Sequence, residues 1–368
     1  MKEKNKTNPA PEFYSFKELD KIPAVYKLVV GQRSNGKTFA YLSEKVLEDF
    51  FSLARPSAYI RRWDEDIKPS NIANLFDPQI PNLIALSNGE YNCFIYRSKC
   101  WYPVFRDENG DITKRCPDFI CKAYSVNNWE HAKGQDAGNF KNIGFDEFIS
   151  RGCYVPNEFA CFQNLLSSII RNRDDVNIYM IANTVSKFCP YFTEMRIDID
   201  KVASGEIVVY NNKAGDPFIA LERCSPNKNV QSSVVKYYDF EDNIASKMIT
   251  AGEWEVPQYR HMPCKYIPEM DIFTAYIEHT YKLTLKVVAL DNDIMLYVYP
   301  TRKEHISDEN DIVYCDRPRT PFQSVSLTDR KTKAHNLIAT LISENKICFS
   351  DNDTGDKFFN FLNREYTP

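Results

Sequence analysis

The segment YKLVVGQRSNGKTFAYL, residues 26–42, carries residue types and spacings that could bind the phosphates of a nucleotide. It matches G-x-x-x-x-G-K-[ST], in which glycines let backbone N–H groups curl around phosphate oxygens, the lysine reaches the β- and γ-phosphates and the last hydroxyl binds Mg²⁺. A chance match is the alternative, but an apolar run precedes the loop and helical spacing follows it. We therefore predict that ATP and Mg²⁺ are bound by Gly31, Gln32, Arg33, Ser34, Asn35, Gly36, Lys37 and Thr38, with Thr38 as a metal ligand.

A pair of acids follows another apolar run, in the segment IGFDEF. A nucleoside triphosphatase needs a carboxylate at the end of a neighbouring strand for Mg²⁺ and a second group that orients the attacking water. Asp146 is expected to take the first role and Glu147 the second. The alternative is a strand end exposed to solvent. The pair indicates an additional-strand ATPase, because small GTPases and nucleotide kinases lack the glutamate beside the metal aspartate.

Five further polar residues, at three places in the chain, are candidates for the same site. Asn183 ends the next expected strand, where it could contact the γ-phosphate or the water, or simply cap a turn. Arg171 and Arg173 follow an expected helix and are candidates for an arginine finger, although positive charge at a helix C-terminus is the simpler explanation. Arg61 and Arg62 end the second expected strand and have the same two explanations.

The elements that must position these side chains follow from hydrophobic spacing. We expect strands at 25–30, 57–63, 141–148 and 176–185, and helices at 37–53 and 157–173, the second with an Asn at its cap. Strands that alternate with helices predict an α/β domain with a mostly parallel sheet. Asn88-Gly89 and Asn109-Gly110 are typical of hairpin turns and predict a β-rich insertion over 82–116.

A chain of 368 residues exceeds what one core usually holds, so two domains are expected. We assign 1–228 to the ATPase domain, 229–263 to a partly helical linker with a helix at 232–251, and 264–368 to a smaller α+β domain. Turn residues dominate 211–229, and 274–299 is expected to form a long hairpin around the sequence LDND.

Composition narrows the class of protein. The net charge of −4 argues against global attraction to nucleic acid, so a polyanion would have to be held by local patches. The 11 cysteines include no CxxC pair, and the closest spacing, Cys116 and Cys121, has no His at zinc-ligand distance, which indicates reduced thiols. No apolar run approaches the ~18 residues of a membrane span. We expect a soluble, intracellular protein without a membrane partner.

The segments VVGQRSNGKT, YIRRW, IGFDEFISRGCYVPNE and IIRNRDDVNIYMIANTVSKFCPYF together resemble the DNA-packaging ATPase of the small Bacillus podophages, a terminase-like genome motor. The similarity is strong in segments from 29 to 192 and weaker beyond. It implies an additional-strand (ASCE) P-loop ATPase that works as a homo-oligomeric ring, a pentamer, on the portal vertex of a prohead. The family's trans-acting arginine falls on Arg171. Its coupling region falls on Arg61 and Arg62, but the lysine that follows in the family is not matched by Trp63 or Asp64.

The resemblance further implies an RNase H-like C-terminal domain that has lost nuclease activity and docks to the prohead, in some relatives also to a structural RNA. A nuclease of that type needs about three convergent carboxylates for two metals. Asp291 and Asp293 lie in an expected turn, where Asp is favoured for turn reasons, and Glu278 stands alone in its segment. We therefore expect no nuclease activity.

The expected function is a ring ATPase that translocates double-stranded DNA into a capsid, in the host cytoplasm and transiently on the portal. Phosphate contacts without base readout suit such a motor, although a solvated surface charge is the simpler explanation for each candidate contact. The alternative function is a P-loop nucleotide or small-molecule kinase, which would not respond to DNA. The candidate DNA contacts are Lys99, Arg106, Lys114, Arg115, Lys133 and Lys141.

Overall fold

The computed structural model describes residues 13–132, 138–150, 154–155, 157–184, 189–225, 259–279, 281–290, 293–301 and 310–365. These residues divide into two compact units, one made of 13–150 and 157–225 and the other of 154–155 and 259–365. The expected boundaries at 228 and 263 and the helix expected at 232–251 lie outside the described residues and stay predictions.

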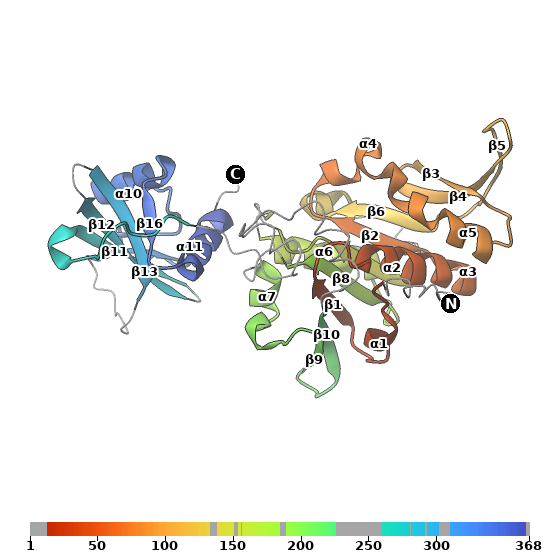
Figure 1. The fold of residues 1–368 in the computed structure, drawn as a ribbon, viewed down its shortest axis with the longest axis horizontal. Helices are drawn as coiled ribbons and strands as arrows, with labels where there is room; N and C mark the ends of the chain where they lie inside the picture. The colour runs from red at the N-terminus through yellow and green to blue at the C-terminus, as the bar shows by residue number, and fades with distance from the viewer. Residues whose placement is uncertain are drawn as a thin grey trace, which may run out of the picture. The chain divides into compact units, whose positions relative to one another are not determined.

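Six of the described strands form the parallel centre of the first unit (Figure 1). In sheet order they are β6 (Cys121–Ser125), β2 (Ser57–Arg61), β7 (Asn142–Asp146), β8 (Asn177–Asn183), β1 (Tyr26–Gly31) and β10 (Pro217–Arg223). Each neighbouring pair runs parallel. β8 lies between β1 and β7, so one additional strand separates the strand before the predicted phosphate-binding loop (residues 31–38, called the phosphate loop below) from the strand that ends in Asp146. The parallel strands with their connecting helices confirm the predicted α/β class.

Antiparallel strands flank this centre on both sides. β9 (Glu206–Asn211) pairs with β10 at one edge. At the other edge β4 (Cys100–Arg106) pairs with β6, and β3 (Cys93–Arg97) and β5 (Ile112–Arg115) pair with β4. Of these, β3, β4 and β5 belong to the β-rich insertion expected over 82–116.

Two helices that matter for the site each follow a strand of the sheet in the chain. The helix expected at 37–53 is a continuous helical segment made of α2 (Lys37–Ala40), a π-helical stretch (Tyr41–Glu48) and α3 (Asp49–Leu53). The helix expected at 157–173 is α6 (Glu158–Ile170). Asn157 occupies its N-cap position, as predicted, but makes no side-chain capping bond.

Short helical pieces complete the connections of the first unit. They are α1 (Lys17–Asp20), α4 (Pro69–Ile72), α5 (Ile80–Leu86), α7 (Pro190–Glu194) and 3₁₀ turns at Asp64–Ile67, Ala73–Gln79, Val126–Ala132 and Ile199–Lys201.

Two expectations from turn residues are corrected. Residues 82–86 belong to α5, and Asn88-Gly89 ends this helix, since the Gly89 N–H donates to the carbonyl of Ile84 at 2.8 Å. The turn between β3 and β4 instead uses Ser98 and Lys99, both at positive φ. Turn chemistry alone cannot tell a helix end from a hairpin, because both need a left-handed residue. The signal at Asn109-Gly110 does mark the hairpin between β4 and β5.

The region 211–229 also differs from the expectation, because it contains a strand as well as turns. Tyr210 and Ile219 pair across the β9–β10 hairpin, and Leu221 of β10 pairs in parallel with Leu28 of β1. The segment PFIALER lies among turn residues, so its local composition carries little sign that it forms a strand of the sheet.

A glycine in β7 sets how closely the helical segment after the phosphate loop can approach the sheet. A Cβ on Gly144 would lie 2.3 Å from Cζ of Tyr41, which is far too close for two carbons. The Tyr41 ring therefore fills the space that a side chain at 144 would take. Its hydroxyl donates to the carbonyl of Ala58 in β2 at 2.9 Å.

The second unit has a mixed sheet covered by two helices (Figure 1). β11 (Asp271–Glu278), β12 (Lys282–Leu290) and β13 (Asp293–Pro300) form an antiparallel meander, so the hairpin expected at 274–299 is part of three strands. β14 (Ile312–Cys315) runs parallel to β11, followed by β15 (Gln323–Ser324), and β16 (Ile347–Phe349) runs parallel to β13. The remaining elements are a 3₁₀ turn at Pro268–Met270, α10 (Lys333–Ser343) and α11 (Asn352–Glu365).

The core of the second unit lies between this sheet and its helices. Leu285, Leu296, Ile338 and Phe358 are fully buried members of that core. The RNase H-like fold that the resemblance implies for this unit stays a prediction.

Candidate active site

The phosphate loop connects β1 to α2, and two of its residues must be glycine for different reasons. Gly36 has φ of 91°, a left-handed conformation that favours glycine. Gly31 is needed because a Cβ there would lie 2.7 Å from the Cβ of Cys224, which follows β10. The loop is therefore packed against the sixth parallel strand.

Lys37 is the most buried cation of the loop, with 4% of its surface exposed. Its Nζ donates to the carbonyls of Gly31 at 3.1 Å and Gln32 at 2.7 Å, and to Oδ1 of Asn35 at 3.0 Å and of Asn183 at 3.3 Å. Burial lowers the pKa of Lys37 to about 8, against the opposing influence of Cys224 and Asp146. The predicted neighbours Lys37 and Asn183 thus come together at the ends of β1 and β8.

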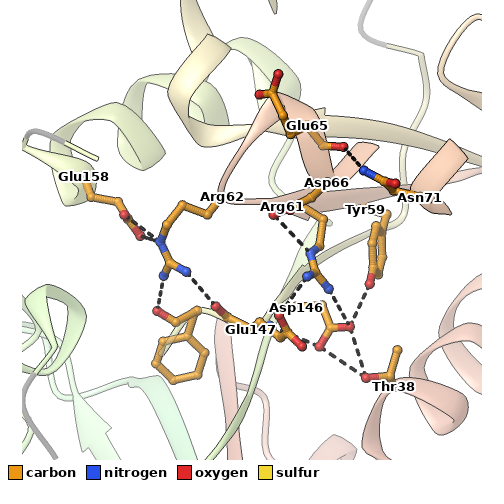
Figure 2. A network of polar contacts seen from close by, with 11 residues as sticks. Thr38, Tyr59, Arg61, Arg62, Glu65, Asp66, Asn71, Asp146, Glu147 and Glu158 are labelled. Atoms are coloured by element: carbon orange, nitrogen blue, oxygen red, sulfur yellow. Dashed lines mark hydrogen bonds and ion pairs between the residues drawn. The ribbon is translucent and has the colours of Figure 1, made fainter. Parts of the chain in front are cut away.

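Thr38 and Asp146 face each other across the loop (Figure 2). The Thr38 hydroxyl donates to Asp146 Oδ2 at 3.1 Å, and the Tyr59 hydroxyl donates to the same oxygen at 2.7 Å. A hydroxyl and a carboxylate side by side are oxygen ligands of the type that Mg²⁺ prefers. The donor set fits the metal that the sequence predicted, and Tyr59 orients the carboxylate.

Glu147 stands next to Asp146 in a left-handed backbone conformation, with φ of 59°. Its side chain is 55% exposed, and its carboxylate Oε2 accepts from Nη2 of Arg61 at 2.7 Å. Arg61 also lies 3.8 Å from both Asp146 and Asp66 (Figure 2). Burial opposes the charge of Arg61, but Tyr59, Asp146 and Glu147 together raise its pKa above the usual value.

Arg62 occupies a different environment from its neighbour, since it is 5% exposed and enclosed by acceptors (Figure 2). Its Nε lies 3.0 and 2.8 Å from the two carboxylate oxygens of Glu158, the first residue of α6. Nη1 donates to the carbonyl of Glu147 at 3.1 Å and Nη2 to that of Phe148 at 2.7 Å. The Tyr191 hydroxyl donates to Glu158 Oε1 at 2.8 Å.

Sequence reasoning missed three members of this site. Tyr59, Glu158 and Tyr191 were not singled out, because buried Tyr and Glu residues look like ordinary members of apolar strands and helices. Two signals pointed toward Glu158: it ends the segment IGFDEFISRGCYVPNE, and it comes directly after a cap residue in a helix that follows the acidic pair.

Arg171 and Arg173 lie at the far end of α6 and differ in their contacts. Arg173 donates to the carbonyls of Ile170 at 3.0 Å and Phe140 at 3.1 Å and also contacts that of Ile169, so it satisfies the helix C-terminus as the simpler explanation anticipated. Arg171 is exposed, with φ of 53° and its backbone N–H on the carbonyl of Ser167.

The topology separates Arg171 from the phosphate loop of its own chain. The loop follows the carboxyl end of β1, whereas Arg171 precedes the amino end of β8, which runs parallel to β1. The seven residues of β8 span roughly 23 Å. Arg171 therefore lies near the amino-terminal ends of the parallel strands, whereas Lys37 lies at their carboxyl ends.

The candidate DNA contacts do not gather in one place. Lys99, Arg106, Lys114 and Arg115 lie on β3 to β5 or their turns, whereas Lys141 precedes β7 at the opposite edge of the parallel strands from the phosphate loop. Lys133 lies outside the described residues.

Each of the described candidates has a local contact. Lys99 pairs with Asp64 at 2.6 Å, Arg106 donates to the carbonyl of Gly110 at 2.7 Å and Lys114 pairs with Glu90. The Arg115 guanidinium lies 3.9 Å from the centroid of the Tyr102 ring, and Lys141 donates to the carbonyl of Asp175 at 2.8 Å. Their role in DNA binding stays a prediction.

The acids considered for a nuclease lie on different elements. Glu278 ends β11, Asp293 begins β13 and pairs with Lys346 at 2.9 Å, and Asp291 lies outside the described residues. Across the part of the chain that the structure describes, no group of three or more His, Cys, Asp or Glu residues is arranged to hold a metal ion. Nor does that part contain a helix with the length and apolar character that crossing a membrane requires.

Comparison with known proteins gives relatives of one kind. Residues 117–231 match the family model described as Podovirus DNA encapsidation protein (Gp16). The DNA packaging proteins of Bacillus phage phi29 and Bacillus phage PZA are each 24% identical over 184 residues, which covers 49% of this chain and 49% of each relative. The chain thus spans, in these matches, about half the length of the curated relatives.

Solved structures extend the similarity over nearly the whole chain. The Phi-28 gp11 DNA packaging motor has a TM-score of 0.54 at 18% identity and covers 98% of this chain and 99% of that chain. The bacteriophage Phi-29 viral genome packaging motor assembly has a TM-score of 0.53 at 18% identity, with 95% and 99% covered. At this identity the likeness concerns the fold. In sequence and in fold, the chain is similar to the DNA packaging proteins of Bacillus phages, as its sequence segments predicted.

Proposed function

We propose that this chain is the ATPase of a phage DNA-packaging motor, which hydrolyses ATP and translocates double-stranded DNA into a prohead. The observation that carries the proposal is the convergence of Lys37, Thr38, Asp146, Glu147 and Asn183 at the carboxyl ends of β1, β7 and β8. The names of the relatives support DNA packaging, and none of those reported above is named a kinase.

The chemical roles follow from the contacts. Backbone N–H groups of the loop and the ammonium of Lys37 bind the phosphates of ATP. Thr38 and Asp146 would hold Mg²⁺, which supplies positive charge against the phosphate oxygens. Glu147 orients the attacking water and accepts its proton, and Asn183 stands beside Lys37 to contact the terminal phosphate or the water.

Arg61 is the candidate for coupling because it holds the carboxylate that has to meet the water. Its ion pair with Glu147 at 2.7 Å competes with the role of that carboxylate as a base. Hydrolysis then requires Glu147 to leave Arg61, so a movement of Arg61 in response to DNA or a neighbour would control the rate.

A ring arrangement accounts for the position of Arg171. Arg171 is exposed near the amino-terminal ends of the strands, away from the phosphate loop of its own chain. An arginine placed there can act on the γ-phosphoryl group of a neighbouring subunit, as arginine fingers supplied in trans do. We propose a homo-oligomeric ring, a pentamer by the family resemblance, assembled on the portal of the prohead in the host cytoplasm. Residues 264–368 would dock the ring, with a structural RNA as a further partner and without nuclease activity.

The test is steady-state ATP hydrolysis across protein concentration, with and without duplex DNA, on wild type and Glu147→Gln. The proposal expects turnover that rises with concentration or DNA and disappears in the variant. A rate that is linear in protein and indifferent to DNA, with proheads present, would contradict the motor and favour a kinase.

A mixing experiment tests the shared site separately. Arg171→Ala subunits keep Glu147, and Glu147→Gln subunits keep the finger, so a ring made of both contains some complete sites. Each variant alone should lose ~10³-fold or more in turnover, and the mixture should recover a fraction of the wild-type rate. No recovery in mixed assembled rings would refute the trans role of Arg171.

A further inference from the structure

The buried guanidinium of Arg62 grips the backbone that carries the proposed catalytic base. Its two Nη groups donate to the carbonyls of Glu147 and Phe148, while Nε is bound to the carboxylate of Glu158 (Figure 2). Glu158 is 2% exposed and is held from its other side by the Tyr191 hydroxyl. One side chain therefore joins the end of β2, the turn after β7 and the start of α6.

These hydrogen bonds hold a stretch of backbone that is under strain. Glu147 has a left-handed φ of 59°, a conformation that a non-glycine residue adopts at a cost and keeps only when its surroundings enforce it. Two charge-assisted hydrogen bonds to consecutive carbonyls are a means of enforcing it. Arg62 reaches Glu147 at its backbone carbonyl, so it can influence the Glu147 carboxylate through the backbone.

We propose that Arg62, fixed by Glu158 and Tyr191, is a positioning residue that holds Glu147 in the orientation needed for water activation. This inference rests on the proposed function of Glu147. It assigns Arg62 a role distinct from that of Arg61, which pairs with the Glu147 side chain directly.

Arginine is required because the contacts use its planar fork. A lysine at 62 keeps the charge beside Glu158 but presents one ammonium in place of three separate N–H directions, so it cannot also hold both carbonyls. Arg62→Lys therefore removes the grip and leaves the buried carboxylate a cationic partner. A purely structural ion pair would tolerate this change with an effect on folding alone.

Arg55 supplies a matched control. It lies before β2 as Arg62 lies after it, and it also holds two carbonyls, of Asn139 at 3.2 Å and Phe140 at 2.9 Å, and one carboxylate, of Asp175. Arg55→Lys loses the same kinds of contact without touching the backbone of Glu147. Any general effect of an Arg-to-Lys change on folding should appear in both variants.

The experiment measures kcat and, separately, the dissociation constant for ATP with Mg²⁺ by titration of the full-length chain. Misplacement of a catalytic group by about 1 Å costs up to ~10²-fold in rate. We expect Arg62→Lys to lower kcat by ~10- to 10²-fold with the dissociation constant changed by less than about threefold. Arg55→Lys should leave both within about threefold of wild type.

A double variant shows whether Arg62 acts through Glu147. In single-turnover measurements, Arg62→Lys/Glu147→Gln should be no slower than Glu147→Gln alone, because the positioned group is already lost. If Arg62→Lys lowers folding stability too far to measure, Tyr191→Phe loosens Glu158 more gently and should lower kcat by about threefold at unchanged affinity.

A normal kcat in folded Arg62→Lys, an equal loss in Arg55→Lys, or a further loss in the double variant would each overturn the inference. The proposed function fails by a different result, the absence of hydrolysis in the wild-type protein. The two outcomes cannot be confused.

Discussion

The low pKa of Lys37 predicts that nucleotide binding weakens in mildly alkaline solution. Burial holds this pKa at about 8 in the free protein, and phosphate oxygens beside the ammonium raise it when nucleotide binds. With a pKa of about 8, roughly 90% of Lys37 is charged at pH 7 and roughly 10% at pH 9. The dissociation constant for ATP should therefore rise by about tenfold between these two pH values.

The assay is a titration with ATP and Mg²⁺ at pH 7, 8 and 9, using Lys37→Arg as the control. The guanidinium stays charged throughout this range, so the affinity of the variant, even if weaker, should not change with pH. The thiol of Cys224, which influences Lys37, has a pKa raised to about 12 by burial and does not titrate here. A dissociation constant for the wild type that stays flat from pH 7 to 9 would refute the reasoning.

The lowered pKa of Lys37 also makes the free energy of unfolding depend on pH. The pKa of Lys37 is lower in the folded chain than the value of about 10.4 in an unfolded one, so the unfolded chain binds more protons in this window. The free energy of unfolding of the nucleotide-free protein should thus gain about 3 kcal/mol from this residue as the pH rises from well below 8 to well above 10.4. Denaturant unfolding at several pH values gives the free energy of unfolding of each protein. It should rise with pH more steeply in the wild type than in Lys37→Met, whose side chain cannot titrate.

Three further predictions concern other contacts of the first unit. Tyr59→Phe removes the 2.7 Å bond to Asp146 and should weaken Mg²⁺-dependent ATP binding by ~1 kcal/mol, measured against Mg²⁺-free binding, which should not change. Gly31→Ala places a methyl against Cys224 and should lower thermal stability by several degrees, with recovery in Gly31→Ala/Cys224→Gly; no recovery would place the clash elsewhere. Arg173→Gln removes the cation at the end of α6 and should cost ~1 kcal/mol in the free energy of unfolding, and an unchanged denaturation midpoint would contradict it.

The parts of the site that could be predicted from sequence are those whose chemistry demands a fixed local spacing. The loop from Gly31 to Thr38 and the Asp146-Glu147 pair each carry their signal within a few residues, and the strands before them are continuous apolar runs. Asn183 followed from its place at a strand end. The parallel order then brought these residues to one edge, as parallel strands require.

The parts that could not be predicted depend on contacts between distant segments. Arg62 and Glu158 meet across 96 residues, and nothing local distinguishes that buried pair from surface charges. β10 was hidden because its pairing with β1 decides its state more than its own residues do. Asn88-Gly89 was misread for the reason that a helix end and a hairpin turn need the same backbone conformation.

The absence of a side chain at Gly144 affects how closely the two proposed Mg²⁺ ligands, Thr38 and Asp146, approach each other. Thr38 and Tyr41 belong to one continuous helical segment, so the depth at which the Tyr41 ring enters the sheet also fixes how far Thr38 stands from Asp146, 3.1 Å away. A single methyl at 144 would act as a spacer and lift that segment away from β7. The glycine two residues before Asp146 thereby sets the distance between the two proposed Mg²⁺ ligands.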